Sequence, residues 1–227
     1  MTATIITVQG SHIAWYDAER ATVEISAAFD GEKRDEVFAR ATQTAADVTA
    51  EITPLNDPAA GPITWWSSDR VNVWSERPWN NDGKRLPLVY HATIGIRAKF
   101  NDFEALSRFV EKLAVMEGVN VGAITWDLTD ERRKEVTDDV RKLAVEDAVQ
   151  KAAAYASAAG AGAPSVIAIA DPGMLGDGSG GGIGPAPMME RMAFKAQAMD
   201  AGGGAPLALS PEQIQVSTSV DVRFTTT

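Results

Sequence analysis

VNVGAITWDLTDERRKEVTDDVRKLAVEDAVQKAAAYASAAG, residues 119–160, joins a short strand to the longest helix that the sequence predicts. No Gly or Pro interrupts residues 123–159, so nothing in this run breaks a helix. Thr129 is a suitable N-cap, and Asp130 and Glu131 place negative charge in the first turn, where the helix dipole is positive. Gly160 is a typical stop. The segment therefore predicts a helix of roughly 30 residues, about 45 Å long.

One face of this predicted helix carries mostly small side chains. Its apolar positions recur at helical spacing, and they are Val140, Leu143, Ala144, Ala148, Ala152, Tyr155 and Ala159. Because alanine lets a second backbone approach closely, we expect this face to lie flat against a sheet.

The composition of the chain excludes several classes of protein. With no Cys among 227 residues, the chain has no disulfides, thiolate metal sites or Cys nucleophiles. A formal charge of −10 disfavours nucleic acid and anionic membrane as partners. No apolar run approaches the roughly 20 residues that span a bilayer. The first residues, MTATIITVQG, lack the basic and apolar blocks of a signal peptide, so we expect a cytoplasmic protein.

The remaining segments alternate between strand and helix patterns. Apolar alternation predicts strands at residues 2–8, 20–29, 63–75, 88–100, 165–170 and 213–226. Helical spacing predicts helices at residues 33–52 and after Asn101, where Glu104 completes a capping box. This order predicts an α+β fold of two interlocked units, each an antiparallel sheet with helices on one face. We expect one unit from residues 1–62 plus 129–227 and the other from residues 63–128.

Residues 171–207 differ from the rest of the chain because Gly, Pro and Met dominate them. Such a composition predicts a flexible insert. Inside it, an amphipathic helix is expected with Met188, Met192 and Met199 on one side. Residues 176–181, GDGSGG, match the spacing of a dinucleotide loop, but more Gly and a Pro follow where a helix would have to begin. We therefore expect a linker and no cofactor.

Several stretches, in this order along the chain, resemble the SIMPL-domain family. They are ITVQG at 6–10, ERATV at 19–23, YHA at 90–92, the helix after Asn101, ITWDLTD at 124–130, the Ala-rich helix and LSPEQIQV at 209–216. The resemblance implies one SIMPL-type domain over residues 1–227, with an α+β fold. It also implies oligomers and a role in stress resistance, as in bacterial members, and it supplies no catalytic residues. Thr93-Ile94 departs from the family, which commonly has Asn after the Tyr-x-Ala element.

The ionisable residues form no recognisable catalytic pattern. His12 and His91 lie on different predicted strands, with no acidic or Ser partner at a familiar spacing. His91 is out of phase with the core positions of its strand, which favours exposure. Asp130-Glu131 and Asp138-Asp139 are neighbours on a helix, where adjacent side chains diverge. We therefore expect no catalytic residues and no metal.

Tryptophans gather on one predicted hairpin. Trp66, Trp74 and Trp79, together with Arg70, are expected on its side away from the core. Exposed Trp and Arg on one surface are typical of an interface. The alternative is that another layer of the chain covers them, such as the segment with Met188, Met192 and Met199.

Three functions are compatible with these patterns. The first is a non-enzymatic homo-oligomer, such as a ring or shell, that acts through contacts with itself or with another protein. The second is a small-molecule-binding protein or hydrolase, with Trp79, His91 and Arg97 near a pocket. The third, a signalling adaptor, rests on family analogy alone.

Overall fold

The computed structural model describes residues 3–79, 85–175 and 209–227, and the chain divides into two units. Unit 1 comprises Met1–Tyr16, Asp130–Gly204 and Gln215–Thr227, and unit 2 comprises Asp17–Thr129 and Ala205–Ile214. Each unit has an antiparallel sheet with helix packed on it, so the predicted α+β class is confirmed. Among the described residues, no helix has the length and apolar character needed to cross a membrane.

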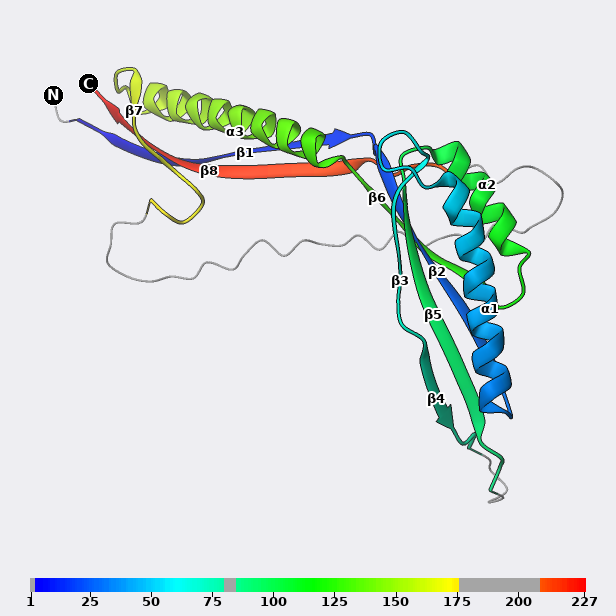
Figure 1. Ribbon diagram of the computed structural model, residues 1–227. Helices are drawn as coiled ribbons and strands as arrows, with labels where there is room; N and C mark the ends of the chain where they lie inside the picture. The colour runs from blue at the N-terminus through cyan, green and yellow to red at the C-terminus, as the bar shows by residue number, and fades with distance from the viewer. Residues whose placement is uncertain (1–2, 80–84, 176–208) are drawn as a thin grey trace. The chain divides into compact units, whose positions relative to one another are not determined.

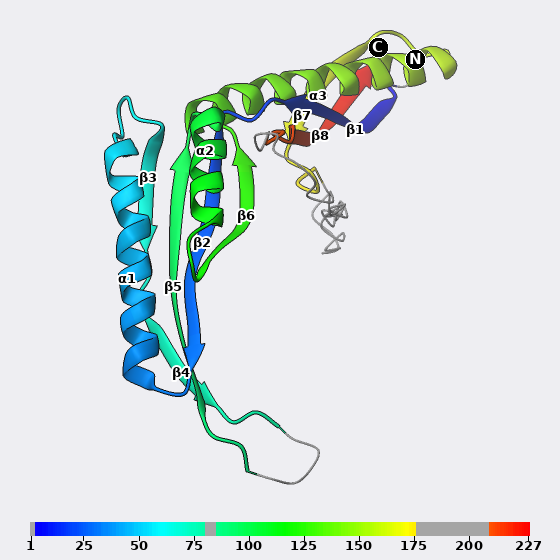
Figure 2. The same ribbon diagram turned by 90° about the vertical axis from the view of Figure 1, so that its right-hand side faces the viewer.

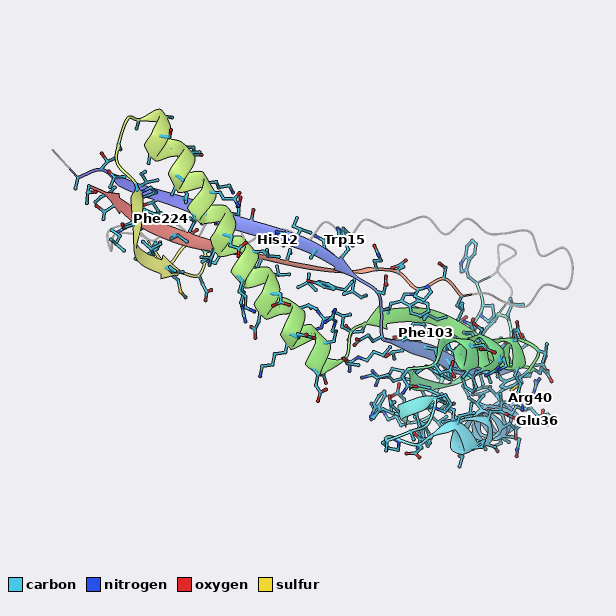
Figure 3. All side chains as sticks on the ribbon, turned by 90° about the horizontal axis from the view of Figure 1, so that it is seen from above. His12, Trp15, Glu36, Arg40, Phe103 and Phe224 are labelled. Carbon is cyan, nitrogen blue, oxygen red and sulfur yellow. The ribbon has the colours of Figure 1, made fainter. Side chains whose placement is uncertain are left out.

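Unit 1 is a long helix on a three-stranded sheet (Figure 1). The strand order is β1 (Ile5–Tyr16), β8 (Ile214–Thr226) and β7 (Pro164–Ala170). Helix α3 (Asp130–Ala158) packs along β1. Its buried residues recur every four positions: Val136, Val140, Ala144, Ala148, Ala152 and Ala156. Two of them, Ala148 and Ala152, form a small core with Val8, Val222 and Phe224, and Phe224 is labelled in Figure 3. The expected close approach of a small-residue face to a sheet is therefore present.

Two details of unit 1 differ from expectation. Strand β1 continues to Tyr16, well beyond the predicted end at residue 8. Leu143 and Tyr155, which we expected on the buried face of α3, are exposed, and so is Ala159, which follows the last residue of the helix. Leu143 and Tyr155 each lie one residue before a buried alanine, at the margin of a stripe that is only one residue wide. Burial is confined to this stripe because β1 is the sheet's edge strand and the main contact of α3.

Unit 2 is a five-stranded sheet covered on one face by two helices (Figure 2). The strand order is β3 (Ile63–Ser68), β5 (Val89–Phe100), β2 (Arg20–Gly31) and β6 (Val119–Asp127), and β4 (Asn72–Glu76) also pairs with β5. Helix α1 (Arg34–Ile52) packs on β2 and β5, and α2 (Phe103–Ala114) packs on β6 and β5. A short 3-10 turn, η1 (Thr53–Leu55), follows α1. The core lies between helices and sheet.

Three expectations about unit 2 are corrected. The single strand expected at residues 63–75 is two strands, β3 and β4, separated where the Asp69 N–H donates to the Gly95 carbonyl at 2.8 Å. Asp102, rather than Asn101, caps α2, because its carboxylate accepts the backbone N–H groups of Glu104 and Ala105. Strand β2 and helix α1 were expected in the other unit, but β2 pairs with both β5 and β6 and so belongs here.

Candidate functional site

The face of the unit 2 sheet opposite α1 and α2 is not covered by either helix, and we call it the open face (Figures 1 and 2). Strand β5 shows how the alternation separates the two faces. Ala92, Ile94, Ile96 and Ala98 are buried in the core, whereas His91, Gly95, Arg97 and Lys99 lie between them on the open face. His91 lies on the non-core side as expected, but its side chain is only 23% exposed, because the ring of Trp74 stacks on it.

A depression of about 460 Å³ lies in the middle of the open face. Its floor carries almost no side chains, because Ser26 on β2 is paired with Gly95 on β5, and Gly122 on β6 lies beside Glu24. A Cβ atom added at Gly95 would lie 2.8 Å from Oδ2 of Asp69. The depression is lined by Glu24, Ile25, Ser26, Asp69, Gly95, Ile96, Arg97, Asn120 and Gly122. A glycine within a strand often marks a place where another group approaches the backbone.

Three charged side chains surround the depression, with the cation between the two anions. Glu24 is the cross-strand partner of Arg97, and Oδ1 of Asp69 lies 4.0 Å from a guanidinium nitrogen of Arg97. At that distance, with both side chains at least half exposed, the ion pair is weak. Within the described residues, this contact is the one interaction of the Arg97 guanidinium, which leaves donors available.

An aromatic cluster occupies the same face nearer the end of β4. The rings of Trp74 and His91 are stacked, with centroids 5.1 Å apart and planes at 16°. Oε1 of Glu76 lies 3.6 Å from Nε2 of His91. At the other end of the face, Nζ of Lys99 lies 5.7 Å from the ring centroid of Trp65. Trp65 and Trp74 are 44% and 43% exposed, so both indoles present apolar surface to the outside.

Trp66 does not share this face, which corrects our prediction for the hairpin. Trp66 pairs with Ala98, whose side chain is fully buried, and it packs against the core beneath the helices. From Trp66 to Trp74 is eight residues (74 − 66), but their partners Ala98 and His91 are seven apart (98 − 91). The break between β3 and β4 thus contains one extra residue, which reverses the alternation and separates the two indoles.

The remaining predicted residues either do not line the depression or lie outside the residues that the structure describes. Arg70 is exposed in the connection between β3 and β4, and Trp79 is 84% exposed after β4. Met188, Met192 and Met199 lie outside the described residues. Of the three residues expected near a pocket, Arg97 lines the depression, His91 belongs to the aromatic cluster, and Trp79 joins neither.

Sequence reasoning did not identify Glu24, Asp69 or Asn120 as site residues. They lie on β2, on the connection after β3 and on β6, and only the pairing of these strands with one another brings them together. The available signal was Gly95, a lone glycine inside an otherwise regular alternating strand. The Glu76 partner of His91 was missed for the same reason, since it depends on the register of β4 with β5.

In the part of the chain that the structure describes, no three His, Asp or Glu side chains are grouped to hold a metal ion. The sequence profile of a family described as SIMPL, protein of unknown function (DUF541), matches residues 6–224, nearly the full length. None of the curated proteins matches the chain.

Proposed function

The chain belongs to the SIMPL family, and we propose that this member is a homo-oligomer that acts through protein contacts rather than by catalysis. Stress resistance is the physiological role that we propose with it, on the family resemblance. The observation that supports assembly is the open face, where Trp65 and Trp74 are each more than two-fifths exposed. Tryptophan is among the residues most enriched at the centres of protein interfaces.

Polar and charged side chains around these indoles fit an interface as well. His91 supports the ring of Trp74 from one side, and Lys99 lies near the ring of Trp65. Stacking and cation–π contact hold each ring in one orientation, which lowers the entropy that a partner must remove on binding. Arg70 and Trp79 are exposed close to β4 in sequence and are proposed as further contact residues.

Size-exclusion chromatography with light scattering tests the assembly. We expect a particle that is a multiple of the 24.2 kDa chain at micromolar concentration, and a smaller particle for the Trp65→Ala/Trp74→Ala double variant. Phe38→Ala is the matched control, because Phe38 is an equally exposed aromatic residue on α1. A strict monomer would overturn the proposal. An oligomer of unchanged mass in the double variant would remove the open face from it.

A second function, binding of a small molecule, is favoured by a different observation. The depression over Gly95 is a concave site with several polar groups around it, among them Arg97. Convergent polar groups over a pre-formed floor are typical of ligand sites. Saturation-transfer NMR on the full chain tests this function, because the method detects weak ligands on a chain of 24.2 kDa or larger.

A further inference from the structure

We propose that the depression on the open face binds a small basic amino acid, one that carries a carboxylate and two cationic nitrogen groups. The proposal rests on the second function above and adds the class of ligand. It uses three features of the depression: a floor with few side chains, the order of the charges around it, and its size.

Part of the floor allows a ligand to lie directly on the sheet. Gly95, Ser26 and Gly122 belong to three adjacent strands, so none of these strands raises a large side chain at this point. The Asp69 carboxylate lies over Gly95, so the open part of the floor is the part over Ser26 and Gly122. The backbone of β2 is paired on both sides, with β5 and with β6, so its N–H and C=O groups are already engaged. The floor therefore supplies van der Waals contact, and recognition falls to the side chains around it.

The charges of those side chains are opposite in sign to the charges of the ligand that would face them. Arg97 lies between Glu24, its partner across the strands, and Asp69, its distant ion-pair partner. A guanidinium binds a carboxylate through two parallel N–H···O bonds, so the ligand carboxylate belongs at Arg97. Its two cationic groups then belong at Glu24 and Asp69, one on each side.

The net charge selects a basic amino acid over a neutral one. Two carboxylates and one guanidinium give the site a formal charge of −1, which a ligand of charge +1 balances. The formal charge of −10 on the whole chain also attracts cations in solution. Asn120 offers both an amide donor and a carbonyl acceptor at the edge of the depression, and so can contact either kind of group.

The volume of the depression, about 460 Å³, falls in the range of small-molecule sites. Because the depression is open, we expect a dissociation constant on the order of 1 mM.

Three probes of matched length separate the contributions of the ligand groups. L-lysine has the carboxylate and both ammonium groups, L-norleucine lacks the side-chain ammonium, and cadaverine lacks the carboxylate. Saturation-transfer titrations on the full chain should show L-lysine binding at least tenfold more tightly than either of the others. Arg97→Gln should weaken L-lysine binding, because the ligand carboxylate loses its partner. It should strengthen cadaverine binding, because the formal charge of the site becomes −2 and balances the charge of +2 on cadaverine.

Two further variants locate the binding. A Cβ atom at Gly122 meets only ordinary contacts at 3.4 Å or more, so Gly122→Val should fold, fill the floor and abolish L-lysine binding. Lys99→Gln is the control, because Lys99 lies on the same face but does not line the depression. Circular dichroism should show that both variants retain the wild-type fold.

The outcomes separate the ligand class from the site. If the three probes bind equally and Gly122→Val removes them all, the site binds small molecules but the basic amino acid class is wrong. If L-lysine binding survives in Gly122→Val, or if no probe gives a signal at 20 mM (roughly twentyfold above the expected dissociation constant), the depression is not a ligand site. Neither result bears on the light-scattering test of assembly.

Discussion

The carboxylate of Asp147 on α3 accepts a hydrogen bond from the backbone N–H of Ser11 on β1 at 2.8 Å. One turn further along the helix, Nζ of Lys151 donates to the carbonyl oxygen of Gln9 at 3.0 Å and pairs with Asp147 at 2.7 Å. β1 is an edge strand of its sheet. The two helix side chains therefore occupy backbone groups that a foreign strand would need in order to add to this edge.

This contact should make the stability of unit 1 depend on pH. The hydrogen bond from Lys151, followed by the one from Ser11, lowers the pKa of Asp147 below its usual value. A carboxylate with a lowered pKa stabilises the folded state above the ordinary pKa of an aspartate, and this stabilisation is lost as pH falls through the folded-state value. Asp147→Asn should therefore be less stable than the wild type at pH 7, and the difference should shrink toward about pH 3.

Urea unfolding at the two pH values measures this difference. Asp139→Asn is the matched control, because among the described residues Asp139 pairs only with Lys142, on the exposed surface of the same helix. A loss of stability in Asp147→Asn that is the same at both pH values would show that the charge of Asp147 is not the cause.

Gly10 should be the position in β1 that is least tolerant of a side chain. A Cβ atom there would lie 2.0 Å from the carbonyl oxygen of Ala144 and 2.7 Å from the Cβ of Ala148. Backbone atoms cannot move aside cheaply, so we expect Gly10→Ala to lower the free energy of unfolding by about 3 kcal/mol. Denaturant unfolding measures this loss. Ser11 is the next residue and points to the exposed side, so Ser11→Ala is the control and should change stability by less than about 0.5 kcal/mol. Equal effects of the two substitutions would contradict the close approach of α3 to Gly10.

The end of α3 offers a separate test of backbone conformation. Gly160 has a φ of +66°, and the N–H groups of Gly160 and Ala161 donate to the carbonyls of Ser157 and Ala156, which is a Schellman motif. In the part of the chain that the structure describes, no atom lies within 4 Å of a Cβ added at Gly160, so only backbone strain opposes a side chain. Gly160→Ala should cost about 1 kcal/mol in thermal or urea unfolding. Gly160→Asn should cost less, because asparagine tolerates this conformation; the reverse order would argue against the motif.

Local patterns were sufficient to predict most elements. The uninterrupted run before Gly160 predicted α3 almost to the residue, and its alanines predicted the close packing on a sheet. The apolar alternation on β5 assigned each side chain to the correct face. In a strand with one buried face, every second side chain must point to the core. These features depend on neighbours within one segment, which the sequence contains.

Features that depend on pairing between distant segments were not predicted. The membership of β2 in unit 2 follows from its pairing with β5 and β6, and no local pattern encodes it. The depression is likewise lined from β2, β5, β6 and the connection after β3. The prediction that Trp66 and Trp74 share a face was wrong because residues 63–75 look like one strand. The structure has two strands there, with one extra residue between them.

The two tryptophans that this break separates should respond differently to truncation. Trp66 packs against the core on the helix side, so Trp66→Ala should lower the free energy of unfolding by about 2 kcal/mol, somewhat less than for a fully buried ring. Trp74 is half exposed and stacks only on His91 within the described contacts, so Trp74→Ala should cost under about 1 kcal/mol. Urea unfolding at several protein concentrations measures both, and extrapolation to low concentration removes the contribution of assembly. If Trp74→Ala proved the more destabilising at low concentration, the placement of the two indoles on opposite faces of the sheet would be wrong.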